Sequence, residues 1–173
     1  PLAEKAGNPI MRAQVHANLG FVSYQKGDWD KALRHYDRGL RALRDSGDEE
    51  CTAVLHGNLS SLYLNRGDLK GAQRSLRIAQ SLREKLGSRA GLGSIYLDMG
   101  RFLMEKSQYE KALACLEKSA AMYREEGERF DLATVLVSLA EAWLFLGNTE
   151  KALACSKESL ELSVAAGNPC AQG

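Results

Sequence analysis

The sequence repeats itself at intervals of 40 residues. KALACLEKS at residues 111–119 returns as KALACSKES at 151–159, with six of the nine residues identical. Glycine recurs at the same interval, and a second set of small residues lies 20 positions away: Gly7, Gly47, Gly87, Gly127 and Gly167, then Gly27, Gly67, Ser107 and Gly147. A fixed period of roughly 20 to 50 residues is typical of proteins built from stacked repeats.

Each half of the 40-residue unit has the apolar spacing of an α-helix. Val15, Leu19 and Val22 follow one another at intervals of four and three residues. Tyr36 and Leu40 repeat this spacing in the second half of the unit. The two sets of small residues then mark helix C-termini, where a residue in the left-handed conformation is needed. The repeat is therefore predicted to be a pair of helices.

The residues after the inter-repeat glycines predict where the helices begin. They are Asn8, Asp48, Ser88, Glu128 and Asn168, and all except Glu128 are good N-caps. We predict eight helices, at 9–26, 29–46, 49–66, 69–86, 89–106, 109–126, 129–146 and 149–166. The turns between them are short, which makes neighbouring helices antiparallel.

The composition fits a soluble folded protein and argues against several other classes. Hydrophobic residues make up 45% of the 173 residues and charged residues 26%. No apolar run reaches the roughly 20 residues that a membrane-spanning helix needs. The net charge of +1 argues against a dedicated nucleic-acid binder. The four cysteines have no tight spacing and predict reduced thiols in a cytoplasmic protein.

The two ends of the chain resemble each other. EKAGNPI at 4–10 is matched by VAAGNPC at 164–170, and the sequence does not begin with Met. We therefore expect residues 1–173 to form a single array cut from a longer one, with repeats at about 8–47, 48–87, 88–127 and 128–167. Solenoids usually need a polar capping element at each end, so self-association through uncapped ends is kept as an alternative.

Four stretches of the sequence carry a family pattern: NLGFVSYQKGDWDKA, NLSSLYLNRGDLKGA, DMGRFLMEKSQYEKA and SLAEAWLFLGNTEKA. A column of small residues follows on the second helix, at Gly39, Ala79, Ser119 and Ser159. Over essentially its whole length the chain resembles tetratricopeptide repeat (TPR) proteins. The period is longer than the family's usual one, as in Pins-type adaptors and the TPR sensor domains of signalling proteins. The resemblance implies an all-α TPR solenoid, a right-handed superhelix of antiparallel helix pairs with four repeats and about eight helices.

The resemblance also implies a groove that binds a partner. In the family the first helix of each repeat lines a concave face. By register, the groove residues are Gln14, Asn18, Phe21, Asn58, Ser61, Asn65, Asp98, Arg101, Glu105, Ser138, Glu141 and Phe145. Asn18 and Asn58 occupy equivalent positions, and such amides either pair with the backbone of an extended peptide or only tie neighbouring helices together. Asp98, Arg101 and Glu105 lie at spacings of three and four on one face, and for them an internal ion pair on the helix surface is favoured over a site for a charged ligand.

The candidate catalytic motifs are incomplete, and the candidate metal ligands are too far apart. SYQK at 23–26 fits Ser-x-x-Lys without its companion motifs, and GLGSIY at 91–96 has only two glycines of a dinucleotide loop. Equivalent positions on stacked repeats lie at least about 8–10 Å apart, too far for His or Cys side chains to share a zinc ion. We therefore predict a protein that is not an enzyme and has no cofactor or metal.

The sequence thus predicts a protein–protein interaction module, a scaffold or adaptor that binds a peptide or protein segment in its concave groove. An apolar anchor of the partner near Phe21 or Phe145 would supply the affinity. No binding to nucleic acid and no insertion into a membrane is expected. Two alternatives remain open: a regulatory or self-association segment of a larger signalling protein, and a structural spacer.

Overall fold

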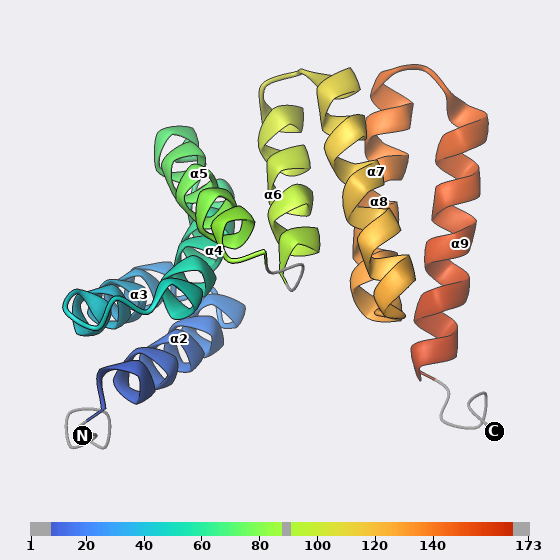
Figure 1. Cartoon of the computed structure of the whole chain (residues 1–173). Coiled ribbons are helices and arrows are strands. Elements are labelled where there is room, and N and C mark those ends of the chain that lie inside the picture. The colour runs from blue at the N-terminus through green and yellow to red at the C-terminus, as the bar shows by residue number, and fades with distance from the viewer. Residues whose placement is uncertain (1–7, 88–90, 168–173) are drawn as a thin grey trace. The chain divides into compact units, whose positions relative to one another are not determined.

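The computed structural model of the chain describes residues 8–87 and 91–167. These residues form helices and no strand (Figure 1). The helices are α2 (Pro9–Gln25), α3 (Trp29–Leu43), α4 (Glu49–Asn65), α5 (Leu69–Lys85), α6 (Leu92–Glu105), α7 (Tyr109–Glu126), α8 (Arg129–Phe145) and α9 (Thr149–Gly167). This confirms the predicted fold class, an all-α solenoid of helix pairs.

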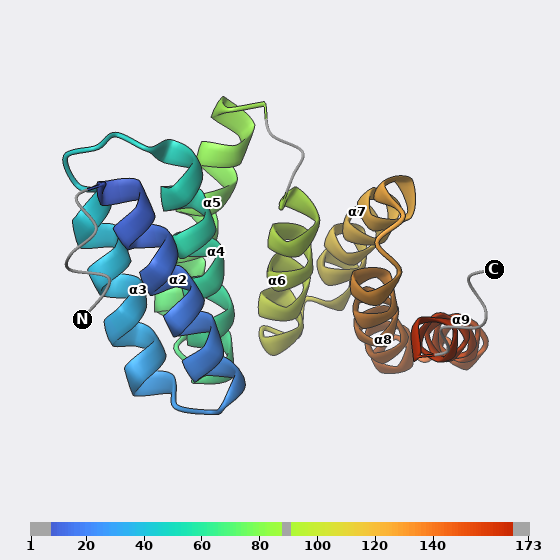
Figure 2. The ribbon, with the colours of Figure 1, turned by 90° about the horizontal axis from the view of Figure 1, so that it is seen from below.

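The chain divides into two compact units, Pro1–Gly91 and Leu92–Gly173. In the first unit α2 pairs with α3 and α4 pairs with α5, and α4 also packs against α2 and α3 (Figure 2). In the second unit α6 pairs with α7 and α8 pairs with α9, and α8 also packs against α6 and α7. Each unit therefore contains two repeats. Whether the four repeats form one continuous array stays a prediction.

The helix boundaries agree with the sequence at most positions. Seven helices begin at the predicted residue, whereas α6 begins at Leu92 instead of 89, and residues 88–90 lie outside the described part. Helix α3 ends at Leu43 rather than 46. There the N–H of Arg44 bonds to the carbonyl of Arg41, and the N–H of Ser46 bonds to that of Leu43. These bonds span three residues, so the last turn tightens before the helix is complete.

Capping follows the predicted pattern. The Asn8 side chain accepts a hydrogen bond from the N–H of Ile10 at 2.9 Å, and Asp48 accepts one from Cys51 at 2.7 Å. Glu128 makes no such bond, as expected. Ser88 and Asn168 lie outside the described residues. Seven of the predicted C-terminal positions have positive φ: Gly27, Gly47, Gly67, Gly87, Ser107, Gly127 and Gly147. Gly7 lies outside the described residues, and Gly167 is the last residue of α9.

The column of small residues on the second helices lets the paired helices approach closely. A Cβ atom on Gly39 of α3 would lie 3.4 Å from the carbonyl oxygen of Ala13 on the paired α2, and 2.9 Å from Cδ1 of Leu55 on α4. The Ser119 hydroxyl is buried and donates a 2.7 Å hydrogen bond to the Gly93 carbonyl of the paired helix. Ser159 makes the equivalent bond to Ala133 at 2.9 Å. The repeat register predicted from the sequence therefore describes the packing.

Each unit has its own apolar core. In the first unit the core lies between α2, α3 and α4, and in the second between α7 and α8. The largest fully buried side chains include Tyr36, Leu55 and Leu62 in the first unit, and Leu116 and Leu136 in the second. Burial of such side chains contributes about 1.5–3 kcal/mol each, which makes the cores the main source of stability.

Candidate functional site

A depression lies between the first helices of the two repeats in the first unit. Its lining residues are Ala13, Gln14, Ala17 and Asn18 from α2, and Glu50, Cys51, Val54 and Leu55 from α4, around a volume of about 400 Å³. Gln14 and Asn18 are one helical turn apart, so they lie on the same face of α2. The alanines are small and leave room between the helices. The depression thus combines an amide wall with an apolar one.

The charged residue that α4 contributes to the depression is paired with a residue of opposite charge. The Glu50 carboxylate forms an ion pair with Arg83 of α5, whose side chain is buried. Burial, and to a lesser extent the charge of Asp48, raises the pKa of the Cys51 thiol, while a hydrogen bond with Gln14 acts in the opposite direction. A thiol with a raised pKa is protonated at neutral pH and is a poor nucleophile. The depression can therefore hold a neutral group by contact and hydrogen bonding.

Three predicted groove residues of α2 lie along one line. Gln14 and Asn18 are exposed and line the depression, and Phe21 lies one turn further along with half of its surface exposed. Asn58, the equivalent of Asn18 on α4, is half-buried and is not among the residues that line the depression. The two equivalent asparagines therefore differ in environment.

The end of α4 contacts the end of α2 through polar side chains. The Asn65 amide donates a 2.6 Å hydrogen bond to the Tyr24 hydroxyl. The Ser61 hydroxyl donates to the Gly57 carbonyl at 3.5 Å within α4. Asn65 therefore ties two neighbouring helices together, a role that the sequence analysis left open for Asn18 and Asn58 but not for Asn65.

In the second unit, the acidic and basic residues of α6 contact each other. Asp98 is buried and lies 3.8 Å from the Arg101 guanidinium, so the favoured prediction of an internal ion pair is confirmed. Glu105 is exposed at the end of α6. Because its carboxylate faces Arg101 and little solvent, Asp98 presents little charge at the surface.

The predicted residues of α8 differ in exposure. Ser138 is half-buried and Glu141 is exposed. Phe145, at the end of α8, is largely exposed and stacks on Tyr109 at the start of α7, with ring centroids 4.7 Å apart and planes inclined by 5°. One face of the Phe145 ring is therefore already covered by an aromatic side chain.

The structure also brings together residues that are not among the predicted groove residues. Glu50 and Cys51 line the depression. They lie three or four residues before Val54, so helical spacing alone places them on the same face of α4. His16 of α2 and His35 of α3 lie side by side, with their Nδ1 atoms 3.1 Å apart. Burial, then His16 and nearby basic side chains, lower the pKa of His35. The neutral form of His35 is thus favoured.

Within residues 8–87 and 91–167, no three His, Cys, Asp or Glu side chains converge in a way that could hold a metal ion. None of the helices in this part of the chain has the length and apolar character to cross a membrane. Cys51, Cys115 and Cys155 are free thiols, and Cys170 lies outside the described residues.

Comparison with known proteins identifies the repeat. The family model described as tetratricopeptide repeat matches residues 11–85 and 91–163, in agreement with the two units of the structure. No curated protein sequence matches the chain.

Several solved structures have the same fold at low sequence identity. BtubC (BKLC) from P. vanneervenii matches with a TM-score of 0.78 and 20% identity, over 96% of this chain and 69% of that one. A signal transduction ATPase with numerous domains (STAND) from Pyrococcus horikoshii, which has a tetratricopeptide repeat sensor, matches with a TM-score of 0.78 and 22% identity. This match covers 97% of this chain and 25% of that protein, so the present chain spans about a quarter of its length. MamA matches with a TM-score of 0.51 and 18% identity, over 90% of this chain and 93% of that one.

Proposed function

The chain belongs to the tetratricopeptide repeat family, and on this premise we propose that it binds an extended peptide segment of a partner protein along α2 and α4. Repeats of this family generally mediate protein–protein interaction. The further steps of the proposal, the site and the kind of ligand, come from the geometry of the first unit.

The observation that carries the proposal is the depression between α2 and α4. Its volume of about 400 Å³ is enough for an apolar side chain, and Val54 and Leu55 supply apolar contact. Gln14 and Asn18 lie beside it, and an amide can both donate to and accept from a peptide backbone. The balanced charge of Glu50 favours an uncharged side chain in the depression. Phe21 extends the apolar surface by one helical turn.

The remaining predicted groove residues have a smaller part in this proposal. Asn65 is hydrogen-bonded to Tyr24, so pairing with a ligand backbone would require that bond to break. Phe145 can offer a partner only the ring face that Tyr109 leaves open. Asn58, Ser61, Asp98, Arg101, Glu105, Ser138 and Glu141 stay predictions from the register.

A peptide-display selection on the 173-residue chain tests the proposal. The test variant is Ala17→Leu, which fills the depression, and Ala121→Leu on the exposed side of α7 is the matched control. We expect one apolar motif to be enriched on the wild type and the control and to bind Ala17→Leu at least tenfold more weakly. Asn18→Ala should weaken binding of the same peptide by roughly 0.5–1.5 kcal/mol, the usual value of one hydrogen bond.

Two results would contradict the proposal. Enrichment that is equal on Ala17→Leu and on the wild type would place the ligand elsewhere. If no peptide is enriched on any variant, although all variants are as stable as the wild type, the structural spacer or the regulatory alternative would be favoured.

The regulatory alternative is favoured by one specific observation. The structural neighbour from Pyrococcus horikoshii carries its tetratricopeptide repeats as the sensor of a signal transduction ATPase. In that reading, the present repeats would regulate a larger signalling protein rather than act as an adaptor. A cytoplasmic location and the absence of nucleic-acid binding stay predictions from the sequence.

A further inference from the structure

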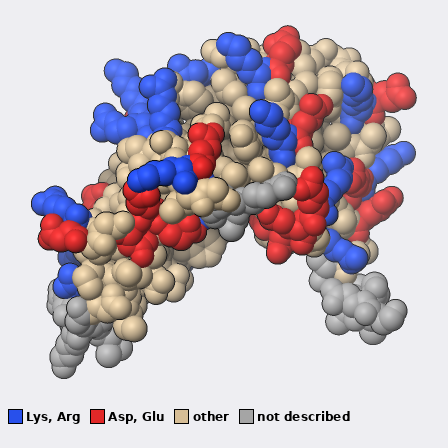
Figure 3. Space-filling view, viewed as in Figure 1, with Lys and Arg blue, Asp and Glu red and all other residues tan. Residues whose placement is uncertain are grey.

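Three basic residues follow one another along the exposed face of α5. Lys70, Arg74 and Arg77 are spaced by four and three residues, so they lie on one face of the helix, and all three are exposed. We name them the α5 stripe. Lys and Arg side chains gather over α5 at the upper left of Figure 3. Within the described part of the chain, no residue of the stripe forms an ion pair with a carboxylate.

The exposure of the α5 stripe does not depend on the ends of the chain or on how the two units are placed. Its equivalents on α3 are Asp30, Arg34 and Asp37, which are exposed although the next repeat packs against α3 in the same unit. A following repeat therefore leaves these positions open to solvent. The same positions on α7 and α9 are also exposed: Glu110, Ala114, Glu117, Glu150, Ala154 and Lys157.

The basic character belongs to α5 and is not required by the fold. The formal charge at these three positions is +3 on α5, −1 on α3, −2 on α7 and 0 on α9. All four helices pair with their neighbours in the same way, so the pairing needs no positive charge here. Like charges three and four residues apart also destabilise a helix. The three cations thus favour a role outside the fold.

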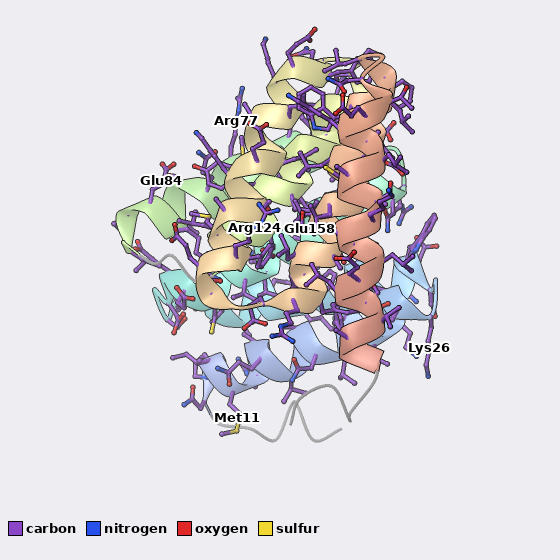
Figure 4. All side chains as sticks on the ribbon, turned by 90° about the vertical axis from the view of Figure 1, so that its right-hand side faces the viewer. Met11, Lys26, Arg77, Glu84, Arg124 and Glu158 are labelled. Carbon is purple, nitrogen blue, oxygen red and sulfur yellow. The ribbon has the colours of Figure 1, made fainter. Side chains whose placement is uncertain are left out.

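The neighbouring carboxylates border the stripe and do not neutralise it. Glu84 lies seven residues after Arg77 and projects on the same side of α5 (Figure 4), where it accepts a 2.8 Å hydrogen bond from Gln80. Asp68 is the N-cap of α5 and accepts a 2.9 Å bond from the N–H of Gly71. The stripe is therefore short, and it covers roughly 10 Å along the helix at about 1.5 Å per residue.

This size and setting favour an acidic protein segment over nucleic acid. The pKa of Tyr63 on α4 is raised most by burial and then by Asp37, while Arg74 acts in the opposite direction, so both charges lie near its hydroxyl. A phosphate backbone that continued from α5 toward α3 would meet the Asp37 carboxylate. Single-stranded nucleic acid also needs exposed aromatic rings for stacking. The Tyr63 ring is half-buried and lies against Gly71.

We propose that the α5 stripe binds a short run of Asp or Glu residues in a partner protein. The guanidinium groups of Arg74 and Arg77 suit bidentate hydrogen bonds with carboxylates, and Lys70 adds a third positive charge. An extended chain advances roughly 3.3 Å per residue, so about four acidic residues cover the stripe. The stripe shares no residue with the depression between α2 and α4, so this inference does not depend on the peptide site proposed there.

The inference is tested by the fluorescence anisotropy of a labelled peptide of eight consecutive glutamates, titrated with the 173-residue chain. The test variant is Arg74→Gln/Arg77→Gln. The matched control is Lys111→Gln/Lys157→Gln, which removes two exposed positive charges from the second unit. We expect the test variant to bind the peptide at least tenfold more weakly than the wild type and the control. A rise in salt from about 50 to 500 mM should weaken binding several-fold, because salt screens exposed charges.

Circular dichroism identifies a test variant that fails to fold, and Lys70→Gln/Arg77→Gln then replaces it. Three results would overturn the inference: no binding of the glutamate peptide by the wild type, equal weakening in the control, or tighter binding of a labelled single-stranded DNA of eight nucleotides that the test variant loses. The last result would assign the stripe to nucleic acid. Ala17→Leu should leave binding of the glutamate peptide unchanged, so failure here is separable from failure of the site between α2 and α4.

Discussion

Gly100 of α6 lies directly against the side chain of Leu116 of α7. A Cβ atom built on Gly100 would be 2.5 Å from Cδ2 of Leu116 and 2.6 Å from its Cγ. The equivalent pair in the first repeat is Gly20 and Tyr36, where the distance would be 2.4 Å. Both partner side chains are fully buried and have no room to move away. The absence of a side chain at these positions is therefore a requirement of the packing.

Substitution of Gly100 by Leu should strongly destabilise the second unit. We expect a loss of at least about 2–3 kcal/mol in the free energy of unfolding, because an overpacked core forces side chains and backbone apart. Urea unfolding monitored by circular dichroism measures the effect. Gly57→Ala is the control, since a Cβ there meets nothing within 4 Å. That change should be neutral or stabilise α4 by up to about 1 kcal/mol. A Gly100→Leu variant as stable as the wild type would mean that the register is wrong.

Ser107 has φ of 55°, in a column where Gly27, Gly67 and Gly147 have φ of 72° to 76°. The left-handed conformation costs a residue with a Cβ roughly 1–2 kcal/mol, and glycine avoids most of this cost. Ser107→Gly should therefore raise the free energy of unfolding by up to about 1 kcal/mol, observed as a higher melting temperature. The reciprocal change, Gly67→Ser, should lower it by a similar amount. A Ser107→Gly change that lowers the free energy of unfolding, or a Gly67→Ser change that raises it, would contradict the interpretation.

The Ser119 hydroxyl donates to the Gly93 carbonyl in the buried contact between α7 and α6. Ser119→Ala removes the bond and keeps the small size, so we expect a loss of about 0.5–1.5 kcal/mol in the free energy of unfolding. Ser119→Val should cost more, because the extra methyl groups would push the two helices apart. Thermal unfolding of the two variants gives the ranking. If valine were tolerated better than alanine, the helices would not be in close contact here.

Acidification should destabilise the first unit through its histidines. Burial lowers the pKa of His56, whose Nδ1 atom is buried and makes no hydrogen bond. The pKa of His35 is lowered as well. A histidine with a lowered pKa binds fewer protons in the folded than in the unfolded state, so stability falls as the pH drops through about 6.5. Urea unfolding at pH 7.5 and pH 5.5 should show the loss.

His56→Leu isolates the contribution of one histidine, because leucine stands at the equivalent position 136. Between pH 7.5 and pH 5.5 the variant should lose less free energy of unfolding than the wild type. The difference between the two losses should be at most about 1.4 kcal/mol per pH unit. Equal losses in both proteins would show that His56 does not contribute to the acid sensitivity.

The periodic features of the chain could be predicted from the sequence. Positions such as Gly39 and Ser119 repeat at 40 residues, and a repeat constrains both the helix boundaries and the faces that pack. The predicted N-caps Asn8 and Asp48 follow from the same argument, because capping is a local property of a few residues. The exception, Leu43 at the end of α3, depends on a tightened last turn, for which the sequence carries no distinct signal.

The candidate site was predicted less completely. Register placed Gln14 and Asn18 on the face of α2 that lines the depression, but it treated Asn58 as their equal although that residue is half-buried and does not line it. It also could not show that Asn65 would bond to Tyr24, 41 residues earlier. Such contacts depend on how far two helices separate and which rotamers fit between them.

By itself the sequence determined the repeat, the helices and the small residues at their contacts, because these follow from periodicity and from the local chemistry of turns and caps. The tertiary structure alone decided how the side chains are covered, as at the depression between α2 and α4 and at the ring of Phe145 against Tyr109. The physical reason is that exposure is not a local property. A leucine at the same repeat position is buried or exposed according to whether another helix covers it, as Leu59 and Leu19 show.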